Sequence, residues 1–503
     1  MDRLRVGYLT CAGAVVLATG YLTLFAPLRP LSGDDTSKAK KEVTSRLPPP
    51  AEGWPRPQLT LFLTGRQHGY LEPCGCTGLA NAKGGISRRD ALLTDIRARG
   101  WPVVTFDVGN QVRRSGPQPE IKFQTTISLL KKLGYDAIGF GPDDLKLSTA
   151  ELAFAVGESE NSPFICSNVD LFGLNAKSQI FERGGTKIGV TAALGSDAAK
   201  AINNTEIEIS DPVPAITAEL AKLKAAGCQL LVLLAHTDLE ETRAWAAKFP
   251  DFNVILTAGG AGEPTLEPER VDGSRAQIVQ VGTKGMYVGL LGFYPGQDPP
   301  VRYERIELDD RFPDSERVME AFGLYQQQLQ DMGLEGLGLQ PSPHPLGKDR
   351  KFVGHEVCGD CHTQAMDVFL DTPHLHATDS IAHPTERSDI PRHFDPECLS
   401  CHVTGWNAQQ YFPYESGYLD LAKFEHLHGN GCENCHGPGS KHVAAENGDV
   451  EVTEEELQAL RASMRITVEQ ARESKCYECH DLDNSPDFDF DTYWEQVKHE
   501  GVD

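Results

Sequence analysis

Apolar residues recur in short runs between residues 59 and 308, and stretches with helical spacing separate several of these runs. Short apolar runs of this kind predict strands at 59–64, 103–108, 137–140, 164–168, 188–192, 230–235, 254–257 and 278–282. Helices are predicted between some of the strands, at 122–133, 214–226 and 240–248. This alternation is typical of an α/β layer fold.

The pattern changes after residue 308. A further helix is predicted from 315 to about 332, and the Gly- and Pro-rich stretch 333–348 indicates an interdomain linker. Beyond residue 351 the periodicity stops, and Cys, His, Gly, Pro and acidic residues replace most aliphatic ones. We therefore expect an α/β domain over 58–310, a helix and linker over 311–350, and a second domain over 351–503 whose core is completed by a cofactor.

The N-terminus has the pattern of an export segment. Arg3 and Arg5 precede a largely apolar run over 6–28, and a polar, Pro-rich stretch follows. About 23 residues at ~1.5 Å each would span a bilayer. No small-x-small cleavage site stands out, and Cys11 lies too early for an ordinary lipoprotein site, which favours an uncleaved anchor over a cleaved signal peptide. We predict a signal anchor or signal peptide over 1–31, a linker over 32–57, and a periplasmic or extracytoplasmic location.

The length and net charge of the chain bear on the number of domains and on the possible partners. A chain of 503 residues is too long for one ordinary core. A formal net charge of −25 repels the phosphates of nucleic acids, and the sequence shows no basic patch that would offset this repulsion. Nucleic acid is therefore not expected as a partner.

Eight of the thirteen cysteines form four Cys-x-x-Cys-His motifs, at 358–362, 398–402, 432–436 and 476–480, which we number 1 to 4. The composition alone predicts about 0.01 such motifs, so four indicate c-type haem attachment. Two thiols bond the haem vinyl groups, and the adjacent histidine becomes the proximal iron ligand. Zinc ribbons or redox dithiols, the alternatives, do not require a histidine after every pair. The attachment residues are Cys358, Cys361, Cys398, Cys401, Cys432, Cys435, Cys476 and Cys479, and the proximal ligands are His362, His402, His436 and His480.

The stretches FVGHEVCGDCH, DTPHLHAT, FDPECLSCHVTGW, GCENCHGPGSKHV and CYECHDLDNSPDFDFDTYW resemble the tetrahaem cytochrome c family best known from ammonia oxidisers, where it takes electrons from hydroxylamine oxidation. The resemblance implies a mostly α-helical, haem-packed domain with four closely stacked haem c groups, most with two histidine ligands. It leaves open whether one iron lacks a sixth protein ligand. The family usually has a small residue where His355 stands, so His355 is not counted. The distal candidates are His442, His499, His374 or His376, and, more weakly, His393.

Polar stretches follow the predicted strands of the N-terminal domain in a fixed order, namely Arg66-Gln67-His68-Gly69, Asp107-Val108-Gly109-Asn110, Gly141-Pro142-Asp143-Asp144, His236 and Gly259-Gly260. This order resembles the metal motifs of the calcineurin-like metallophosphoesterases, specifically the branch with periplasmic 5′-nucleotidases and thiosulfohydrolases. The resemblance implies a metallophosphoesterase-like α/β sandwich.

The same comparison shows that the metal motifs are degenerate. A two-metal site needs about seven or eight ligands and a bridging acid. The family's first aspartate is Arg66 here, its bridging aspartate is Asn110, and its last histidine is Gly260. An arginine at the first position would repel a cation. The candidate N-terminal site keeps His68 and His236, with Asp107 and Asn110 nearby, so an additional divalent metal stays an alternative.

A cysteine pair has been added after the first strand, in the segment Glu72-Pro73-Cys74-Gly75-Cys76. Cys74 and Cys76 could hold a soft metal together with His68 or His236. They could also be redox thiols that pass electrons to the haems. A structural disulfide, which an oxidising compartment favours, is the third interpretation.

These observations predict an exported, anchored two-domain protein whose main activity is one-electron transfer through four haems. Its expected partners are redox proteins or quinone-linked donors, with a small-molecule substrate as an addition. One alternative is a metal-dependent hydrolase of nucleotides or sulfur esters that carries haems. Another is a haem redox enzyme that acts on a small nitrogen or sulfur species.

Overall fold

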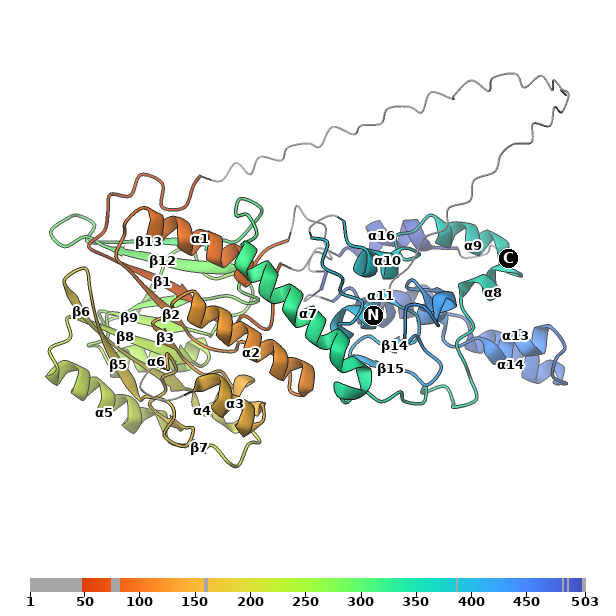
Figure 1. The fold of residues 1–503 in the computed structure, drawn as a ribbon, viewed down its shortest axis with the longest axis horizontal. Coiled ribbons are helices and arrows are strands. Elements are labelled where there is room, and N and C mark those ends of the chain that lie inside the picture. Colours follow the sequence, from red (N-terminus) through yellow and green to blue (C-terminus); the bar gives the residue numbers. More distant parts are fainter. Residues whose placement is uncertain are drawn as a thin grey trace, which may run out of the picture. The chain divides into compact units, whose positions relative to one another are not determined.

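The computed structural model describes residues 48–73, 82–157, 162–385, 388–481, 484–485 and 488–499 (Figure 1). All of them belong to one compact unit, Ser45–Asp503. The predicted export segment, most of the linker after it, and Cys74 and Cys76 lie outside the described residues. None of the described helices is long and apolar enough to cross a bilayer.

The first sheet of the N-terminal domain has five strands in the order β13-β12-β1-β2-β3. Strands β1, β2 and β3 are parallel, whereas β12 pairs antiparallel with both β1 and β13. Every residue of β1 and β2 is buried, as expected for strands covered on both faces. The bounds are β1 (Leu59–Thr64), β2 (Val103–Asp107), β3 (Ala137–Ile138), β12 (Tyr287–Phe293) and β13 (Val301–Glu307).

The second sheet has six strands in the order β10-β11-β9-β8-β6-β5, of which β6, β8, β9 and β11 are parallel. Leu61 and Val104 of the first sheet pack with Val190 and Val232 of the second in one buried cluster, so the sheets form a sandwich. The bounds are β5 (Ser178–Arg183), β6 (Thr186–Leu194), β8 (Leu230–His236), β9 (Val254–Thr257), β10 (Glu269–Arg270) and β11 (Gln277–Gln280). A separate two-stranded sheet pairs β4 (Val169–Asp170) with β7 (Glu208–Ile209).

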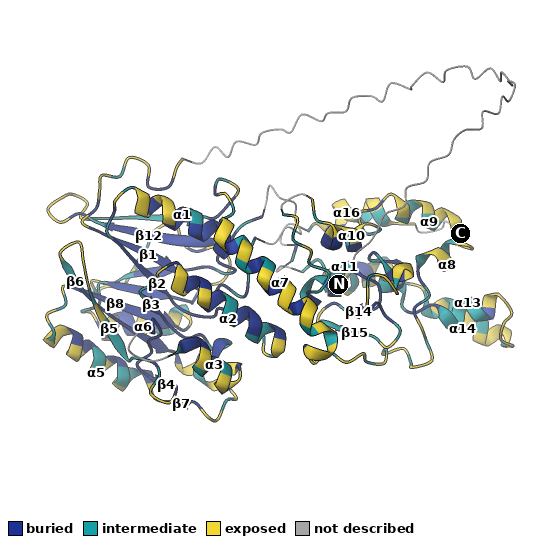
Figure 2. Cartoon of the chain, viewed as in Figure 1, coloured by how far each residue is buried: buried dark blue, intermediate teal, exposed yellow. Residues whose placement is uncertain are grey.

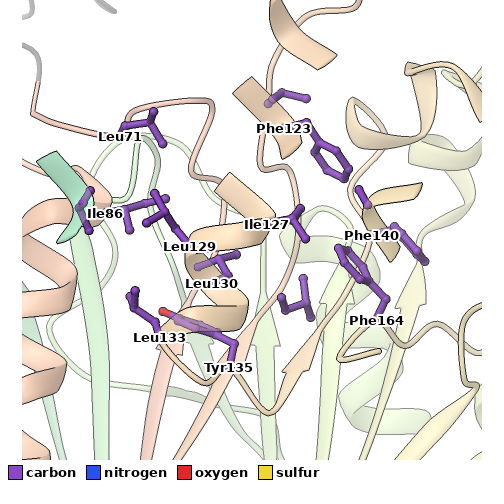
Figure 3. Close-up of a cluster of buried hydrophobic side chains, with 14 of the residues drawn as sticks. Leu71, Ile86, Phe123, Ile127, Leu129, Leu130, Leu133, Tyr135, Phe140 and Phe164 are labelled. Atoms are coloured by element: carbon purple, nitrogen blue, oxygen red, sulfur yellow. The ribbon is translucent and has the colours of Figure 1, made fainter. Parts of the chain in front are cut away.

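Helices cover both outer faces of the sandwich, and only their outward sides are exposed (Figure 2). Ile127, Leu130 and Leu133 of one such layer pack around Tyr135, and Phe140 stacks on Phe164 with ring centres 4.9 Å apart (Figure 3). The helices of the domain are α1 (Ile86–Ala98), α2 (Pro117–Lys132), α3 (Thr149–Val156), α4 (Ser196–Lys200), α5 (Pro212–Ala225) and α6 (Leu239–Lys248).

Helix α7 (Glu316–Gly336) belongs to this core as well. Its buried residues Val318, Phe322, Tyr325 and Leu329 recur at helical spacing and join the cluster formed by α1 and α2. The helix predicted over 315–332 is therefore confirmed, and it packs on the sandwich.

The C-terminal region is mostly helical, with one short hairpin, β14 (Trp406–Asn407) and β15 (Phe412–Pro413). Its buried apolar cluster contains only Phe352, Ile381, Leu399, Val403, Trp406, Tyr418 and Leu427 among the described residues. So small a cluster agrees with a core that a cofactor completes. The helices are α8 (His355–Gly359), α9 (Thr363–Leu370), α10 (Ala377–Ala382), α11 (Pro396–His402), α12 (Cys432–His436), α13 (Ser440–Glu446), α14 (Glu454–Ser463), α15 (Val468–Gln470) and α16 (Phe490–Val497).

The predicted strands are largely confirmed, with one error, and the strands that were missed include the longer strands β5, β12 and β13. Residues 164–168 were predicted as a strand, but in the structure they make only the isolated bridges of Phe164 with Ile138 and of Ile165 with Ala176. The Asn168 side chain bonds to the backbone of Leu194 instead, which ends the pairing. Strands β12 and β13 were missed because glycines interrupt the first and charged residues fill the second.

A fully buried ion pair ties α1 to the end of β2. The Arg89 guanidinium lies 3.3 Å from an Asp107 carboxylate oxygen, and both side chains are 0% exposed. Asp107 also accepts hydrogen bonds from Thr64, Gln111 and the Gly109 backbone. Asp107, a candidate site residue in the sequence, is thus bonded entirely within the fold.

Replacing Arg89 with methionine should leave the Asp107 charge buried without its cation. We expect the free energy of unfolding of the N-terminal domain to fall by about 3–5 kcal/mol. Urea denaturation of the haem-loaded protein, followed by far-UV circular dichroism, measures this change. Arg243→Met, which removes an exposed ion pair with Glu269, is the matched control and should have little effect. Equal midpoints for the two variants would contradict the structural role of Arg89.

Candidate functional site

Each Cys-x-x-Cys-His motif forms one turn of helix. Motif 2 forms the last turn of α11, and motif 3 forms the whole of α12. In motifs 1 and 4 the backbone N–H of the histidine donates to the carbonyl oxygen of the first cysteine at 2.9 Å. Residues three and four apart in a helical turn lie on the same face. All four motifs therefore present two thiols and an imidazole together, as covalent haem attachment requires.

Three of the four proximal histidines face a second histidine. The ring centres are 6.4 Å apart for His362 and His442, 5.8 Å for His436 and His499, and 6.1 Å for His480 and His374. A histidine nitrogen binds a transition metal at about 2 Å and the ring centre lies roughly 1 Å beyond it, so two histidines on opposite sides of one iron have ring centres about 6 Å apart. The spacing of all three pairs fits a haem iron between the rings.

The second ring nitrogen of the proximal histidines also fits iron ligation. Nδ1 of His436 lies 2.6 Å from the Met464 carbonyl oxygen, and Nδ1 of His480 lies 3.1 Å from the Ser485 hydroxyl. A hydrogen bond at Nδ1 fixes the tautomer and leaves Nε2 as the ligand atom. The residues of this domain therefore suit covalent haem c.

His402 of motif 2 is the exception among the proximal histidines. Its Nδ1 lies 2.8 Å from the Ala377 carbonyl oxygen, so its Nε2 is presented in the same way. Within the described residues, however, no second histidine ring contacts it. Burial lowers the pKa of His402, which keeps the ring neutral and able to bind metal.

The remaining distal candidates lie elsewhere. His376 is exposed at the start of α10, and the ring of His393 lies on Phe394 with centres 3.8 Å apart. Neither makes a ring contact with a proximal histidine among the described residues. The sequence did not decide whether His374 or His376 is the distal candidate. In the structure it is His374 whose ring faces a proximal histidine, His480.

The thiols show which motifs are neighbours. Cys358 of motif 1 shares a hydrogen bond with Cys432 of motif 3, and this bond with burial raises the pKa of Cys358. Cys401 of motif 2 shares one with Cys479 of motif 4, with the same effect on the pKa of Cys479. Motifs 1 and 3 therefore lie side by side, as do motifs 2 and 4.

The residues directly before motif 2 contact the N-terminal domain. Glu397, directly before its first cysteine, forms ion pairs with Lys122 and Arg114 from the region of α2. The buried Asp395 accepts hydrogen bonds from Gln118 and from Tyr325 of α7. These charged residues were not singled out in the sequence, because nothing in the local pattern shows that Arg114, Gln118 and Lys122, which lie 275 to 283 residues earlier, are their partners.

A second contact joins the two domains nearby. Arg392 makes a bidentate pair with Glu72, at 2.7 and 2.9 Å. Glu72 begins the segment that continues into Cys74 and Cys76. The roles proposed for these two cysteines concern residues outside the described part of the chain.

The candidate N-terminal residues gather where strands end. His68 follows β1, Asn110 follows β2, Asp143 follows β3 and His236 ends β8, so all lie at the carboxyl edge of the sheets, the usual location of sites in such folds. The Asn110 amide donates to the Asp143 carboxylate at 2.9 Å. Asp144 accepts four backbone N–H bonds from residues 110–112 and 141 and holds this loop in shape.

The two histidines of this edge are both buried, and the pKa of each is lowered. The pKa of His68 is lowered to about 3, chiefly by burial and then by Arg66 and Arg113. Burial likewise lowers the pKa of His236 to about 4, while its Nδ1 bonds to the Val108 carbonyl. Among the described residues, no group of three or more His, Cys, Asp or Glu side chains could hold a metal ion. The residues present do not fit a two-metal centre.

Comparisons with known proteins give different relatives for the N-terminal and C-terminal regions. Residues 357–437 match the family model described as Cytochrome c554 and c-prime. Cytochrome c-554 of Nitrosomonas europaea is 32% identical over 107 residues, which cover 20% of this chain and 43% of that protein.

The N-terminal region has different relatives. A snake venom 5′-nucleotidase of Gloydius brevicauda is 22% identical over 263 residues, 46% of this chain and 45% of that protein. The chain thus spans about half the length of the curated relatives it matches. A 5′-nucleotidase precursor from Thermus thermophilus superimposes with a TM-score of 0.47 at 21% identity, over 55% of this chain and 59% of that one.

The chain is therefore a fusion of an α/β phosphoesterase-type fold with a multihaem c-type domain. Its C-terminal part is a domain of the cytochrome c554 family, which implies covalently bound haem c, and its N-terminal part is a 5′-nucleotidase-like, calcineurin-like phosphoesterase domain. Both relationships indicate an extracytoplasmic location.

The lowered pKa of His236 predicts a pH effect on stability. Because its folded-state pKa of about 4 lies below the unfolded value of 6.5, the unfolded chain binds the proton first as the pH falls. This contribution to stability is fully present above pH 6.5 and is lost between 6.5 and about 4, on the order of 1 kcal/mol per pKa unit. His236→Gln should therefore flatten the decline of Tm between about pH 7.5 and 5. An unchanged difference in Tm between variant and wild type at the two pH values would contradict this.

Proposed function

We propose that this protein is a multihaem electron carrier whose C-terminal domain holds four haem c groups. The observation that supports it most is the set of three histidine pairs spaced for a shared iron. We assign His442, His499 and His374 as the distal ligands opposite His362, His436 and His480. Iron with two histidine ligands is closed to other molecules and suits electron transfer.

The neighbouring motifs support a continuous route. Motif 1 lies beside motif 3 and motif 2 beside motif 4, and the Cys435 and Cys476 thiols interact electrostatically, which relates motif 3 to motif 4. The attachment motifs therefore follow one another in space in the order 1-3-4-2. The last of these, motif 2, is the one that Lys122 and Arg114 of the N-terminal domain hold in position.

We further propose that redox proteins or quinone-linked donors exchange electrons with this route, and that the N-terminal segment anchors the chain to the membrane. A net charge of −25 would favour a partner with a basic docking surface. Ordinary two-metal hydrolysis is not part of the proposal, because the N-terminal residues do not fit the metal pair.

The distal assignment separates two histidines that are close in sequence. His374→Ala should leave the iron of motif 4 with one protein ligand and convert about one haem in four to a high-spin form. His376→Ala is the matched control and should leave every haem unchanged. Electron paramagnetic resonance of the oxidised variants measures the spin states. A high-spin signal from the His376 variant alone would reverse the assignment.

A second candidate function follows from His402. Since no second histidine ring contacts it among the described residues, the iron of motif 2 could bind a small nitrogen or sulfur species. The reduced wild-type protein should then bind about one carbon monoxide per four haems, and His442→Ala should raise this to about two. Optical titration gives the stoichiometry. If the wild-type protein binds no carbon monoxide, this candidate fails and simple electron transfer remains.

A further inference from the structure

Two cations of the N-terminal domain lie beside the attachment cysteines of motif 2. Lys122 of α2 interacts electrostatically with the Cys398 thiol, and Arg114, just before α2, contacts the Tyr411 ring beside Cys401. We propose that Lys122, assisted by Arg114, sets the reduction potential of the haem at motif 2, so that the α/β domain tunes electron transfer in the haem domain. This inference rests on the proposed haem attachment at motif 2 and extends that function.

Lys122 is a buried cation. The residue is 8% exposed, and its Nζ forms an ion pair with Glu397, the residue directly before Cys398. Burial by itself would lower the pKa of Lys122, but the neighbouring acids Glu397 and Asp395 raise that pKa above its ordinary value. The ammonium group therefore keeps its charge at neutral pH. Because solvent screens a buried charge little, Lys122 acts on a neighbouring redox centre more strongly than an exposed lysine would.

The N-terminal domain is shaped to hold this lysine. Gly69, in the loop after β1, has a φ of +82°, and a Cβ added there would lie 2.5 Å from the Lys122 Cδ. A glycine meets both requirements, because it adopts positive φ without strain and leaves room for the lysine stem. The ring centre of Tyr325, from α7, lies 5.5 Å from the Lys122 Nζ. The loop after β1 and helix α7 thus both help to fix the position of the ammonium group.

Arg114 is the second cation. Its guanidinium carbon lies 3.4 Å from the centre of the Tyr411 ring, and its Nη1 donates to Glu397 at 3.1 Å. Tyr411 lies between β14 and β15 and interacts electrostatically with the Cys401 thiol. Arg114 is half-buried, so solvent screens its charge more than that of Lys122. We expect Arg114 to have the same kind of effect as Lys122, but a smaller one.

The two domains contribute opposite charges to this junction. Lys122 and Arg114 belong to the N-terminal domain, whereas Asp395 and Glu397 belong to the haem domain. A further ion pair runs the other way, because the Arg392 cation of the haem domain pairs with Glu72. The N-terminal domain therefore supplies two cations and one acid, and its contribution to the charge beside motif 2 is positive.

The sign of the effect follows from these charges. In the redox step a one-electron donor, such as a redox protein, loses an electron and the iron at motif 2 gains it, and no bond is made or broken. A nearby cation stabilises the added negative charge, and a nearby carboxylate destabilises it. Lys122 therefore raises the reduction potential at motif 2, and Glu397 lowers it.

The test is a spectroelectrochemical titration of the full-length, haem-loaded protein at neutral pH, resolved into four one-electron midpoints. Lys122→Met should make the reduction of one haem about tenfold less favourable, which lowers its midpoint by about 59 mV. The other three midpoints should stay unchanged, and Glu397→Gln should raise the midpoint that Lys122→Met lowers. Lys132→Met, the same substitution at an exposed position of α2, is the matched control and should leave all four midpoints unchanged.

Two further variants separate an electrostatic role from a structural one. Lys122→Met combined with Glu397→Gln removes both charges and should return the midpoint close to its wild-type value. Arg114→Gln changes a half-buried residue, should fold normally, and should lower the same midpoint by less than Lys122→Met does. Wild-type midpoints in both the Lys122 and Arg114 variants, or shifts of the same sign in Lys122→Met and Glu397→Gln, would overturn the proposal.

The haem content distinguishes failure of this inference from failure of the proposed function. A pyridine haemochrome assay gives the number of haems per chain in the wild type and in each variant. Four haems with midpoints that do not respond to Lys122→Met would contradict the tuning role alone. Fewer than four haems in the wild type would contradict the four-haem carrier, and with it the basis of this inference.

Discussion

One turn of helix, repeated four times, determines the architecture of the C-terminal domain. Each turn fixes two thiols and one histidine on the same face, which would give a haem attached there a set position and orientation relative to its motif. The described apolar cluster of this domain is small, and its helices are mostly short. Such a domain agrees with a core that haem c completes, and the facing histidine pairs are spaced for an iron between their rings.

The junction between the domains obeys a different constraint, the need to satisfy buried charge. Glu397 lies between two cations of the N-terminal domain, and Asp395 is bonded by Gln118 and Tyr325. Removing one member of such a network leaves another buried without a partner, which is costly. The network concentrates on the residues before motif 2, so the N-terminal domain is coupled to the one proximal histidine that faces no second ring in the described structure.

The N-terminal domain shows how a fold can be kept while residues at its site are replaced. The sandwich still brings the ends of β1, β2, β3, β8 and β9 to one edge, as a two-metal enzyme requires. Arg66 and Asn110 replace ligands there, and the histidines that remain are neutral at pH 7 because burial and neighbouring cations lower the pKa of each.

The sequence by itself determined the features that depend on local spacing. The parallel strands, such as Leu59–Thr64 and Leu230–His236, are short apolar runs, so they were predicted correctly. The four Cys-x-x-Cys-His motifs are contiguous, so they could be located from the sequence alone. The sequence could not decide between His374 and His376, because both stand beside the same turn and only the packing of α10 and motif 4 separates them. The sequence also does not indicate that Glu397 forms an ion pair with Lys122, or that the Arg66 side chain donates to the Gly260 carbonyl oxygen. Those contacts join residues roughly 190 to 280 positions apart, and only the tertiary structure brings such residues within hydrogen-bonding distance.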